Sequence, residues 1–317
     1  MLSKRILLID SDGGVDDALA IALAARWVAP DDLILSSVFG NVPVAQATHN
    51  ISLIASRAGL TGATVWQGAA KALDGFTTDA THVHGSDGLG GVCAMMPAHH
   101  ADVAPLDALL TRLRASSSRH KFRLLGIGPA TNIPQLIEAI GLANIEDVTL
   151  MAGSAFDTGN ITQSAEFNLY CDPVAFNVVI ASGAPITVVP LDLCRKVVFE
   201  RARLVTLRKI GSVSDILIPA HEFYMSQYME WDGIDGCFPH DSIAFLVSMF
   251  PDRFVMVGAD IEALTEQDHR GKLIVKRLDE HSRVRVCLGG DLKPIRELFN
   301  SDISLQDFVT RFAVGRS

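Results

Sequence analysis

Four aspartates lie within the ten residues LIDSDGGVDD at positions 8–17, just after the short apolar run Arg5–Ile9. They are Asp10, Asp12, Asp16 and Asp17. Carboxylates this close together repel one another unless a positive charge lies among them. Side chains that offer only oxygen, with no Cys or His beside them, suit Ca²⁺ or Mg²⁺ rather than zinc. Since Gly13 and Gly14 allow a tight turn, the segment predicts a divalent-cation site.

Helix capping is the alternative explanation for part of this cluster. Asp16 and Asp17 open the apolar helical pattern ALAIALAARWVA, where carboxylates bond free N–H groups and favour the macrodipole. Capping accounts for roughly one or two of the four aspartates. The others still require a counter-charge.

The aspartates belong to an alternation of short apolar runs and longer helical patterns. We expect strands at Arg5–Ile9, Leu33–Phe39, Phe122–Ile127, Val148–Met151 and Ile186–Val189. We expect helices at Asp17–Ala29, Val44–Arg57, Asn132–Ile140 and Pro173–Ala181. This spacing indicates right-handed crossovers and an α/β fold, with a mostly parallel, Rossmann-like open central sheet flanked by helices.

The last third of the sequence has a different pattern. After Glu200 it is mostly helical, over residues 201–230 and 241–249. Two strand candidates follow, Lys272–Leu278 and Arg283–Leu288, and the polar turn DEHS between them predicts a terminal β-hairpin. Because no Pro/Gly/Ser-rich linker divides the sequence, we expect one domain over residues 1–317 with a helical C-terminal elaboration.

Polar or glycine-rich segments follow several of the expected strands. They are FGN at 39–41, GIGPATN at 126–132 and MAGS at 151–154. Ligands of open parallel sheets bind outside the carboxyl ends of the strands. These loops and the aspartate loop should therefore share one rim.

Composition excludes several classes of protein. A net charge of −9 and a pI near 5.5 argue against a nucleic-acid or anionic-membrane surface, which would need a basic footprint. Five widely spaced cysteines without a CxxC pair argue against a disulfide framework or a zinc site. The apolar runs are too short for a signal peptide or a membrane span. We therefore expect a cytoplasmic protein with no nucleic-acid or membrane partner.

Six segments in order along the chain resemble the motifs of the inosine–uridine preferring nucleoside hydrolases. DSDGGVDDA at 10–18 resembles the first motif of that family, DxDxGxDDA, with Gly13 where a proline is usual. The others are FGN at 39–41, HVHGSDGLGG at 82–91, IGPATNI at 127–133, GNITQSAEFNLYCDPVAF at 159–176 and PHDSIAF at 239–245. The usual MGG is MAG at 151–153, which leaves contacts to the base or the 5′-hydroxyl open.

The resemblance implies a ribonucleoside hydrolase, which cleaves the N-glycosidic bond to give ribose and a free base. It implies Ca²⁺ as cofactor, held by Asp12, Asp17, Asp241 and the backbone carbonyl of Ile127. A metal ion lowers the pKa of its bound water, and Asp12 is our choice for the general base that completes the deprotonation. We expect Asp10 to orient the loop instead of binding the metal.

The resemblance also implies substrate contacts and a general acid. The ribose contacts are Asp16, Asn41, Asn160, Glu166 and Asn168, with His84 near the sugar or the base. We expect His240, with a pKa near its usual value, to protonate the leaving base. That histidine, together with Val83, favours inosine, uridine or other pyrimidine nucleosides. The family resemblance further implies nucleoside salvage and a homodimer or homotetramer.

Some assignments stay open at this point. Tyr224, Tyr228 and Trp231 could pack a nucleobase or belong to the core, and His82 is more simply a neighbour of the site. One competing enzyme class is a Mg²⁺-dependent phosphatase of the haloacid dehalogenase type with Asp10 as nucleophile. A non-catalytic nucleoside binder on the same scaffold is the other alternative.

Overall fold

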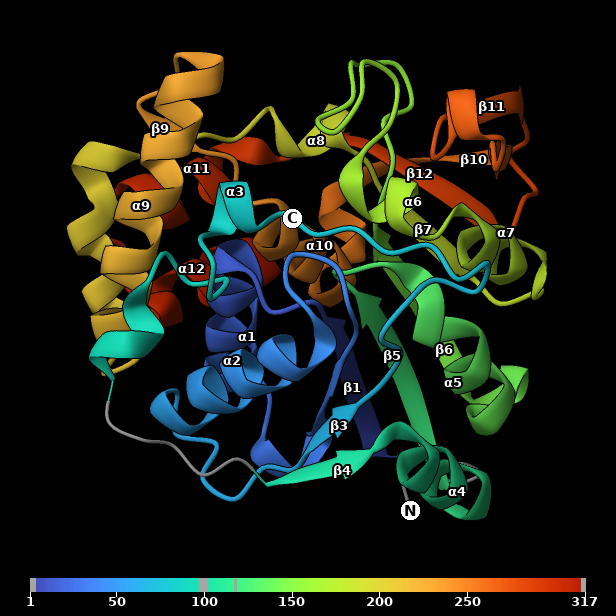
Figure 1. The fold of residues 1–317 in the computed structure, drawn as a ribbon, viewed down its shortest axis with the longest axis horizontal. Coiled ribbons are helices and arrows are strands. Elements are labelled where there is room, and N and C mark those ends of the chain that lie inside the picture. Colours follow the sequence, from blue (N-terminus) through green and yellow to red (C-terminus); the bar gives the residue numbers. More distant parts are fainter. Residues whose placement is uncertain (1–3, 97–101, 117–118, 315–317) are drawn as a thin grey trace.

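A ten-stranded sheet runs through the centre of the protein (Figure 1). The computed structural model describes residues 4–96, 102–116 and 119–314. The strand order is β11-β10-β12-β7-β6-β5-β1-β2-β3-β4, and every pairing from β12 to β4 is parallel. The strands are β1 Lys4–Ser11, β2 Leu33–Ser37, β3 Val65–Gln67, β4 Val103–Pro105, β5 His120–Gly126, β6 Ile145–Met151, β7 Ile186–Val189, β10 Phe254–Ala263, β11 Leu273–Leu278 and β12 Val284–Gly290. The expected α/β fold with a mostly parallel central sheet is confirmed.

Helices cover both faces of this sheet, as Figure 1 shows for α1, α2 and α9 on one side and α4 and α5 on the other. The first layer contains α1 Val15–Trp27, α2 Val44–Arg57, α9 Ser214–Asp232, α10 His240–Met249, α11 Leu292–Asn300 and α12 Leu305–Val314. The second contains α4 Leu106–Ser116, α5 Ile133–Ile140 and α7 Pro173–Ala181. Each layer buries its own apolar cluster against one face of the sheet.

Helix α1 lies deep in the first layer. Its residues from Val15 to Ala24 are all buried, because α2, α9 and α10 pack around it. A helix covered on every side has no solvent-facing stripe, which explains the continuous apolar run ALAIALAA. The acidic N-terminus of α1 is thereby held at the carboxyl edge of the sheet.

The C-terminal hairpin differs from the expected one. The strands at 273–278 and 284–290 exist, but the predicted pairing between them is wrong because β10 lies between them and pairs antiparallel with both. The hairpin present is β10–β11. The register of β10 shifts at Val255/Met256 and at Asp260/Ile261, and such irregularities break the alternation that marks a strand in sequence.

Other elements refine the expected boundaries. The helical stretch after Glu200 begins with a 3₁₀ helix at Arg201–Ile210 before α9, and α11 and α12 follow β12. A two-stranded sheet joins β8 Phe199–Glu200 to β9 Gly236–Cys237. The helices within the described ranges include none that is both long and apolar enough to cross a membrane.

Aromatic stacking attaches α12 to the first layer, which yields a stability prediction. The Trp27 ring stacks on Phe308 with centroids 5.7 Å apart, and Phe308 is fully buried. We expect Phe308→Ala to lower the free energy of unfolding by about 3–5 kcal/mol, because it removes a packed ring and leaves a cavity. Chemical denaturation measures this, with Leu278→Ala as control since Leu278 is 61% exposed. Equal losses in the two variants would contradict the expectation.

Candidate functional site

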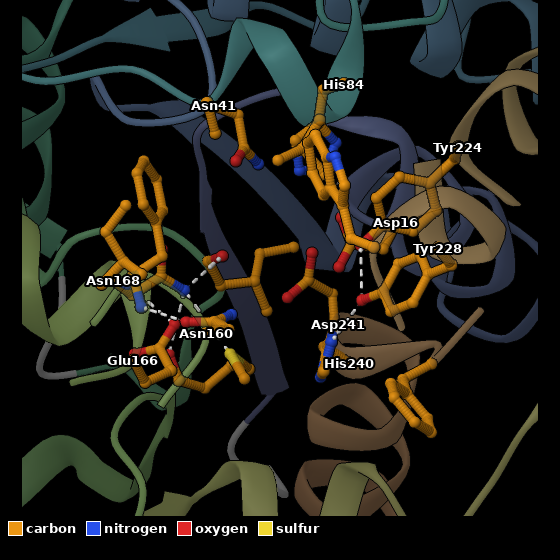
Figure 2. Close-up of a pocket in the computed structure, with 18 of the residues that line it drawn as sticks. Asp16, Asn41, His84, Asn160, Glu166, Asn168, Tyr224, Tyr228, His240 and Asp241 are labelled. Carbon is orange, nitrogen blue, oxygen red and sulfur yellow. Dashed lines mark hydrogen bonds and ion pairs between the residues drawn. The ribbon is translucent and has the colours of Figure 1, made fainter. Parts of the chain in front are cut away.

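One pocket opens at the carboxyl edge of the sheet, where the polar loops were expected to meet (Figure 2). Residues following β1, β2, β5 and β6 line it together with residues from α9 and α10. Those that the sequence singled out are Asp16, Asn41, His84, Ile127, Asn160, Glu166, Asn168, Tyr224, Tyr228, Trp231, His240 and Asp241. Asp12 and Asp17 are fully buried next to the pocket.

Three buried carboxylates meet beside this pocket. Asp16 and Asp17 lie in the first turn of α1 and Asp241 in the first turn of α10, with one ligand atom of each within 4.8 Å of the others. Burial, and then the charge of Asp17, raise the pKa of Asp16 to about 8. Burial and the charges of Asp16 and Asp17 likewise raise the pKa of Asp241 well above its usual value.

No basic side chain neutralises this group among the residues that the structure describes. Asp16 Oδ1 is buried and has no hydrogen-bond partner there. Its neighbour His84 lies 4.0 Å away through Nδ1, but that nitrogen accepts the N–H of Val15. Burial lowers the pKa of His84 to about 3, so the ring is neutral at pH 7. A group of oxygen donors without a counter-charge fits a hard divalent cation.

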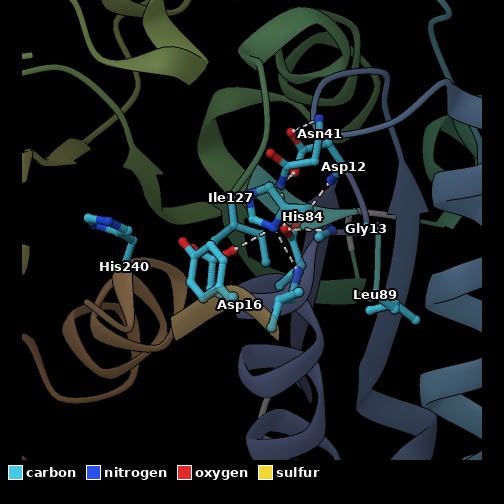
Figure 3. Close-up of polar contacts among 12 residues, drawn as sticks. Asp12, Gly13, Asp16, Asn41, His84, Leu89, Ile127 and His240 are labelled. Carbon is cyan, nitrogen blue, oxygen red and sulfur yellow. Dashed lines mark hydrogen bonds and ion pairs between the residues drawn. The ribbon is translucent and has the colours of Figure 1, made fainter. Parts of the chain in front are cut away.

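Asp12 lies beside this group instead of within it. Its Oδ2 accepts the N–H of Asn41 at 2.8 Å and its Oδ1 accepts Asn41 Nδ2 at 2.9 Å (Figure 3). The same Nδ2 also donates to Asp17 Oδ2 at 3.1 Å, so one amide bridges two carboxylates. Burial and the charge of Asp17 raise the pKa of Asp12 well above its usual value. The structure therefore groups Asp16, and not Asp12, with Asp17 and Asp241.

Glycines make room for the aspartate loop. Cβ atoms at Gly40 and Gly128 would contact the side chain of Asp12, so the loops after β2 and β5 need the missing side chains for this close approach. Gly13 has a φ of +72°, a conformation that the proline usual at this position in the family motif could not adopt. The turn at Gly13 is therefore specific to glycine.

Asp10 lies outside the pocket, under the loops. It is 1% exposed, and its Oδ1 accepts Ser36 Oγ at 2.6 Å and Asn132 Nδ2 at 2.9 Å. Burial raises its pKa to about 6. These contacts join the ends of β1, β2 and β5, which fits an orienting carboxylate. A nucleophile of the phosphatase type has to reach its substrate, and this buried position disfavours that alternative.

The wall opposite the acidic group carries Asn160, Glu166 and Asn168 (Figure 2). Glu166 caps α6 Phe167–Cys171: its carboxylate accepts the N–H groups of Asn168 and Leu169, and also that of Gly153. Burial raises the pKa of Glu166. Asn168 Nδ2 donates to the carbonyls of Ile127 and Met151, both at 3.1 Å. These side chains are held by backbone groups, so Glu166 and Asn168 do not form a solvated loop.

A chain of hydroxyl groups approaches His240 from α9. The Tyr228 hydroxyl lies 3.0 Å from His240 Nε2 and 3.3 Å from the Tyr224 hydroxyl, and the Tyr224 ring stacks on His84. The expectation of a near-normal pKa for His240 is wrong, because burial and the charge of Arg195 lower it to about 3. His240 Nδ1 has no partner within the described part of the chain.

The pocket also contains residues that the sequence did not single out for the site. His82, taken there as a neighbour, lines the pocket with its ring 5.4 Å from that of Trp231. Phe167 lies within the AEFN segment, and Arg195 follows a four-residue helix after β7. The position of Phe167 inside the AEFN motif could have indicated that it lines the pocket. Arg195 lies in no recognised motif, so no sequence signal indicated its place in the pocket.

Comparison with known proteins supports these observations. A sequence model of the inosine-uridine preferring nucleoside hydrolase family matches residues 7–297. A probable uridine nucleosidase of Oryza sativa subsp. japonica is 32% identical over 265 residues, which are 82% of this chain and 81% of the relative. A pyrimidine-specific ribonucleoside hydrolase of Photobacterium profundum is 30% identical over 280 residues, with coverages of 86% and 89%.

Solved structures show the same fold. A plant nucleoside hydrolase matches with a TM-score of 0.81 at 24% identity, covering 94% of this chain and 98% of the other. A purine-preferring ribonucleoside hydrolase from Gardnerella vaginalis matches with a TM-score of 0.80, also at 24% identity, covering 98% of both chains.

The acidic group predicts how the protein responds to divalent cations. Asp241→Asn removes one of three like charges, so we expect the chelator-treated variant to melt above chelator-treated wild type. With Ca²⁺ or Mg²⁺ at about 100 times Kd, wild type should gain about 2.7 kcal/mol and the variant clearly less. Thermal unfolding with and without cation measures both effects. Asp252→Asn, at an exposed position, is the control. If Asp241→Asn gained as much stability from the cation as wild type does, the proposed site would be refuted.

Proposed function

The chain belongs to the inosine–uridine preferring nucleoside hydrolase family and is a ribonucleoside hydrolase, and we propose how its residues cleave the N-glycosidic bond. The observation that carries the proposal is the buried carboxylate group of Asp16, Asp17 and Asp241 beside a pocket whose far wall is formed by Glu166 and Asn168. A ribose placed between these walls meets polar groups on both sides. Cleavage of the N-glycosidic bond in this position releases ribose and a free base.

We propose Ca²⁺ as the cofactor, held by Asp12, Asp17, Asp241 and the backbone carbonyl of Ile127. Asp12 lies outside the group of three carboxylates but adjoins it, because Asn41 bridges Asp12 and Asp17. When bound, such an ion lowers the pKa of a coordinated water molecule. The all-oxygen donor set and the lack of a basic partner support this choice. Because the Ile127 carbonyl already accepts one hydrogen bond from Asn168, its second lone pair remains for a ligand.

Asp12 is proposed as the general base. Burial and the charge of Asp17 raise its pKa in the absence of a cation, and a bound cation would oppose this shift and keep the carboxylate ionised to accept a proton. Asn41 donates one hydrogen bond to each of its oxygens, and each oxygen keeps a further lone pair that can accept a proton or meet a ligand.

The ribose contacts are proposed to be Asp16, Asn41, His84, Asn160, Glu166 and Asn168. An anionic lining suits a transition state of oxocarbenium character, in which positive charge develops on the sugar. Glu166 and Asn168 are held by backbone donors and acceptors, so little reorganisation is needed when that charge appears.

His240 is proposed to donate the proton to the leaving base, with the Tyr228 hydroxyl bonded to its Nε2. Burial keeps the imidazole neutral in the free protein at pH 7. Negative charge that develops on the departing base raises the pKa of the adjacent imidazole, which takes up a proton from solvent, passes it to the base as the bond breaks and returns to its neutral form.

Several finer properties complete the proposal. We infer a preference for inosine, uridine or other pyrimidine nucleosides, because Val83 and His240 match that branch and two relatives are named for uridine or pyrimidine substrates. We also propose one domain over residues 1–317, a homodimer or homotetramer, and a cytoplasmic role in nucleoside salvage. Neither nucleic acid nor a membrane is proposed as a partner.

Hydrolysis of a panel of nucleosides tests the proposed reaction and the role of Asp12 as its general base. We expect ribose release from at least one of inosine, uridine, cytidine and adenosine, and its loss with chelator. Asp12→Asn should lower kcat by about 10²–10⁴-fold, because the proton acceptor is removed, whereas Asp252→Asn should match wild type. No release from any of the four nucleosides would overturn the proposal. Phosphate release from p-nitrophenyl phosphate would favour the phosphatase alternative.

The leaving group tests His240. His240→Ala should lower kcat for uridine by about 10²–10⁴-fold. The loss should shrink to less than about tenfold for p-nitrophenyl riboside, because nitrophenolate leaves without a proton. His281→Ala, whose side chain is 89% exposed, is the control. Equal losses for the two substrates would rule out the acid role.

A further inference from the structure

The loop of residues 153–160, between β6 and α6, is held by a segment from the next strand crossover. This segment contains α8 Leu191–Cys194 and Arg195. Its Asp192 carboxylate accepts the N–H of Ala155 at 2.8 Å and of Phe156 at 2.7 Å. The N–H of Leu191 also donates to the carbonyl of Gly153 at 2.9 Å. The first half of the loop is thus fixed to α8.

Arg195 holds the second half of the same loop. Its guanidinium donates to the carbonyl of Thr158 at 2.6 Å and to the carbonyl of Gly159 at 3.0 Å, and it pairs with Asp157 at 3.2 Å. A planar fork of donors can bind neighbouring acceptors at once, which the single ammonium group of a lysine cannot reproduce. Asn160, the proposed ribose contact, follows directly.

Apolar packing contributes little to holding this loop. Phe156 at its tip is 68% exposed, and residues 156–158 are exposed. Within the loop, Ser154 Oγ donates to the Asp157 carbonyl at 2.7 Å. At its end, Asn160 Oδ1 accepts the N–H of Phe167 at 2.9 Å. The N–H groups of Gly159 and Asn160 donate to the carbonyls of Gln163 and Ala165 and fix the end of the loop, so Asp192 and Arg195 mainly restrain residues 155–158.

The loop meets the substrate at a definite end of the pocket. Asn160 and Glu166 lie opposite Asp16 and Asp241 (Figure 2). The 2′- and 3′-hydroxyls of ribose are adjacent and can share the acidic group, so the 5′-hydroxyl is the one left for the opposite wall. This assignment rests on the proposed function.

We propose that Asp192 and Arg195 are positioning residues that hold residues 153–160 so that Asn160 recognises the 5′-hydroxyl group of the nucleoside. Asp192 acts through the loop alone. Arg195 also lines the pocket, where its charge lowers the pKa of His240, so Asp192→Asn is the variant that isolates the effect of the loop. Their removal should weaken selection for the 5′-hydroxyl more than it weakens hydrolysis itself.

The test compares a nucleoside that wild type hydrolyses, such as uridine, with its 5′-deoxy analogue. We expect Asp192→Asn to lower kcat/KM for the nucleoside about tenfold, the worth of one such hydrogen bond, and to leave the analogue within about threefold of wild type. Arg195→Met should lower the ratio of kcat/KM between the two substrates by a similar factor, and Arg195→Lys should restore only part of that loss. Asn160→Ala should also lower the ratio of kcat/KM for the nucleoside to kcat/KM for the 5′-deoxy analogue. Combining Asn160→Ala with Arg195→Met should lower this ratio little further.

Arg123→Met is the matched control. The Arg123 side chain is 24% exposed, as is that of Arg195, and it pairs with Glu146 and donates to a backbone carbonyl away from the pocket. This variant should keep the wild-type ratio of the two substrates. Three results would overturn this inference and leave the proposed function intact. They are equal losses for both substrates in Arg195→Met and Asp192→Asn, additive losses when these changes are combined with Asn160→Ala, and a wild type that hydrolyses both substrates equally well. A wild type that hydrolyses no nucleoside would overturn the proposed function and this inference with it.

Discussion

Asp16, Asp17 and Asp241 bring their carboxylates within 4.8 Å of one another in a buried position, and their mutual repulsion has to be offset by the surrounding structure. Two helices contribute to this. The carboxylates lie in the first turns of α1 and α10, where the free N–H groups and the macrodipole favour negative charge. These two helices pack against each other in one layer, so their acidic N-termini reach the same edge of the sheet. A cation would remove the remaining repulsion.

The polar residues around this group are fixed mainly by backbone contacts. Asn41 bridges Asp12 and Asp17, Asn168 bonds two loop carbonyls, and Glu166 caps the helix that follows it. Such side chains are ordered before any substrate arrives, which lowers the reorganisation needed in the transition state. The loop that carries Asn160 differs from them, because residues 156–158 are exposed and side chains from a neighbouring crossover hydrogen-bond its backbone.

Much of the fold follows from local patterns, and the exceptions have physical causes. Strands β1, β2, β5, β6 and β7 and helices α1, α2, α5 and α7 were predictable because buried strands and amphipathic helices differ in period. The three-residue strands β3 and β4 were not predicted, since so short a strand has no readable alternation, and helix α4 was not predicted either. Strand β10 was missed because two register shifts interrupt its alternation, and the hairpin was consequently assigned to the wrong pair of strands. Helices α11 and α12 were missed as well. At the pocket, burial lowers the pKa of His240 to about 3, and no sequence pattern reports burial.

The sequence by itself determined the class of fold, the rim on which the site lies, and the residues of the recognised motifs, because these depend on residue types and short spacings. Tertiary structure decided which carboxylates meet. Asp16 joins Asp17 and Asp241 while Asp12 turns to Asn41, and Arg195 reaches the pocket from a segment with no motif. These outcomes depend on which side chains become buried together from segments far apart in the sequence, such as residues 16–17 and 241, and only the packing of helices against the sheet decides that.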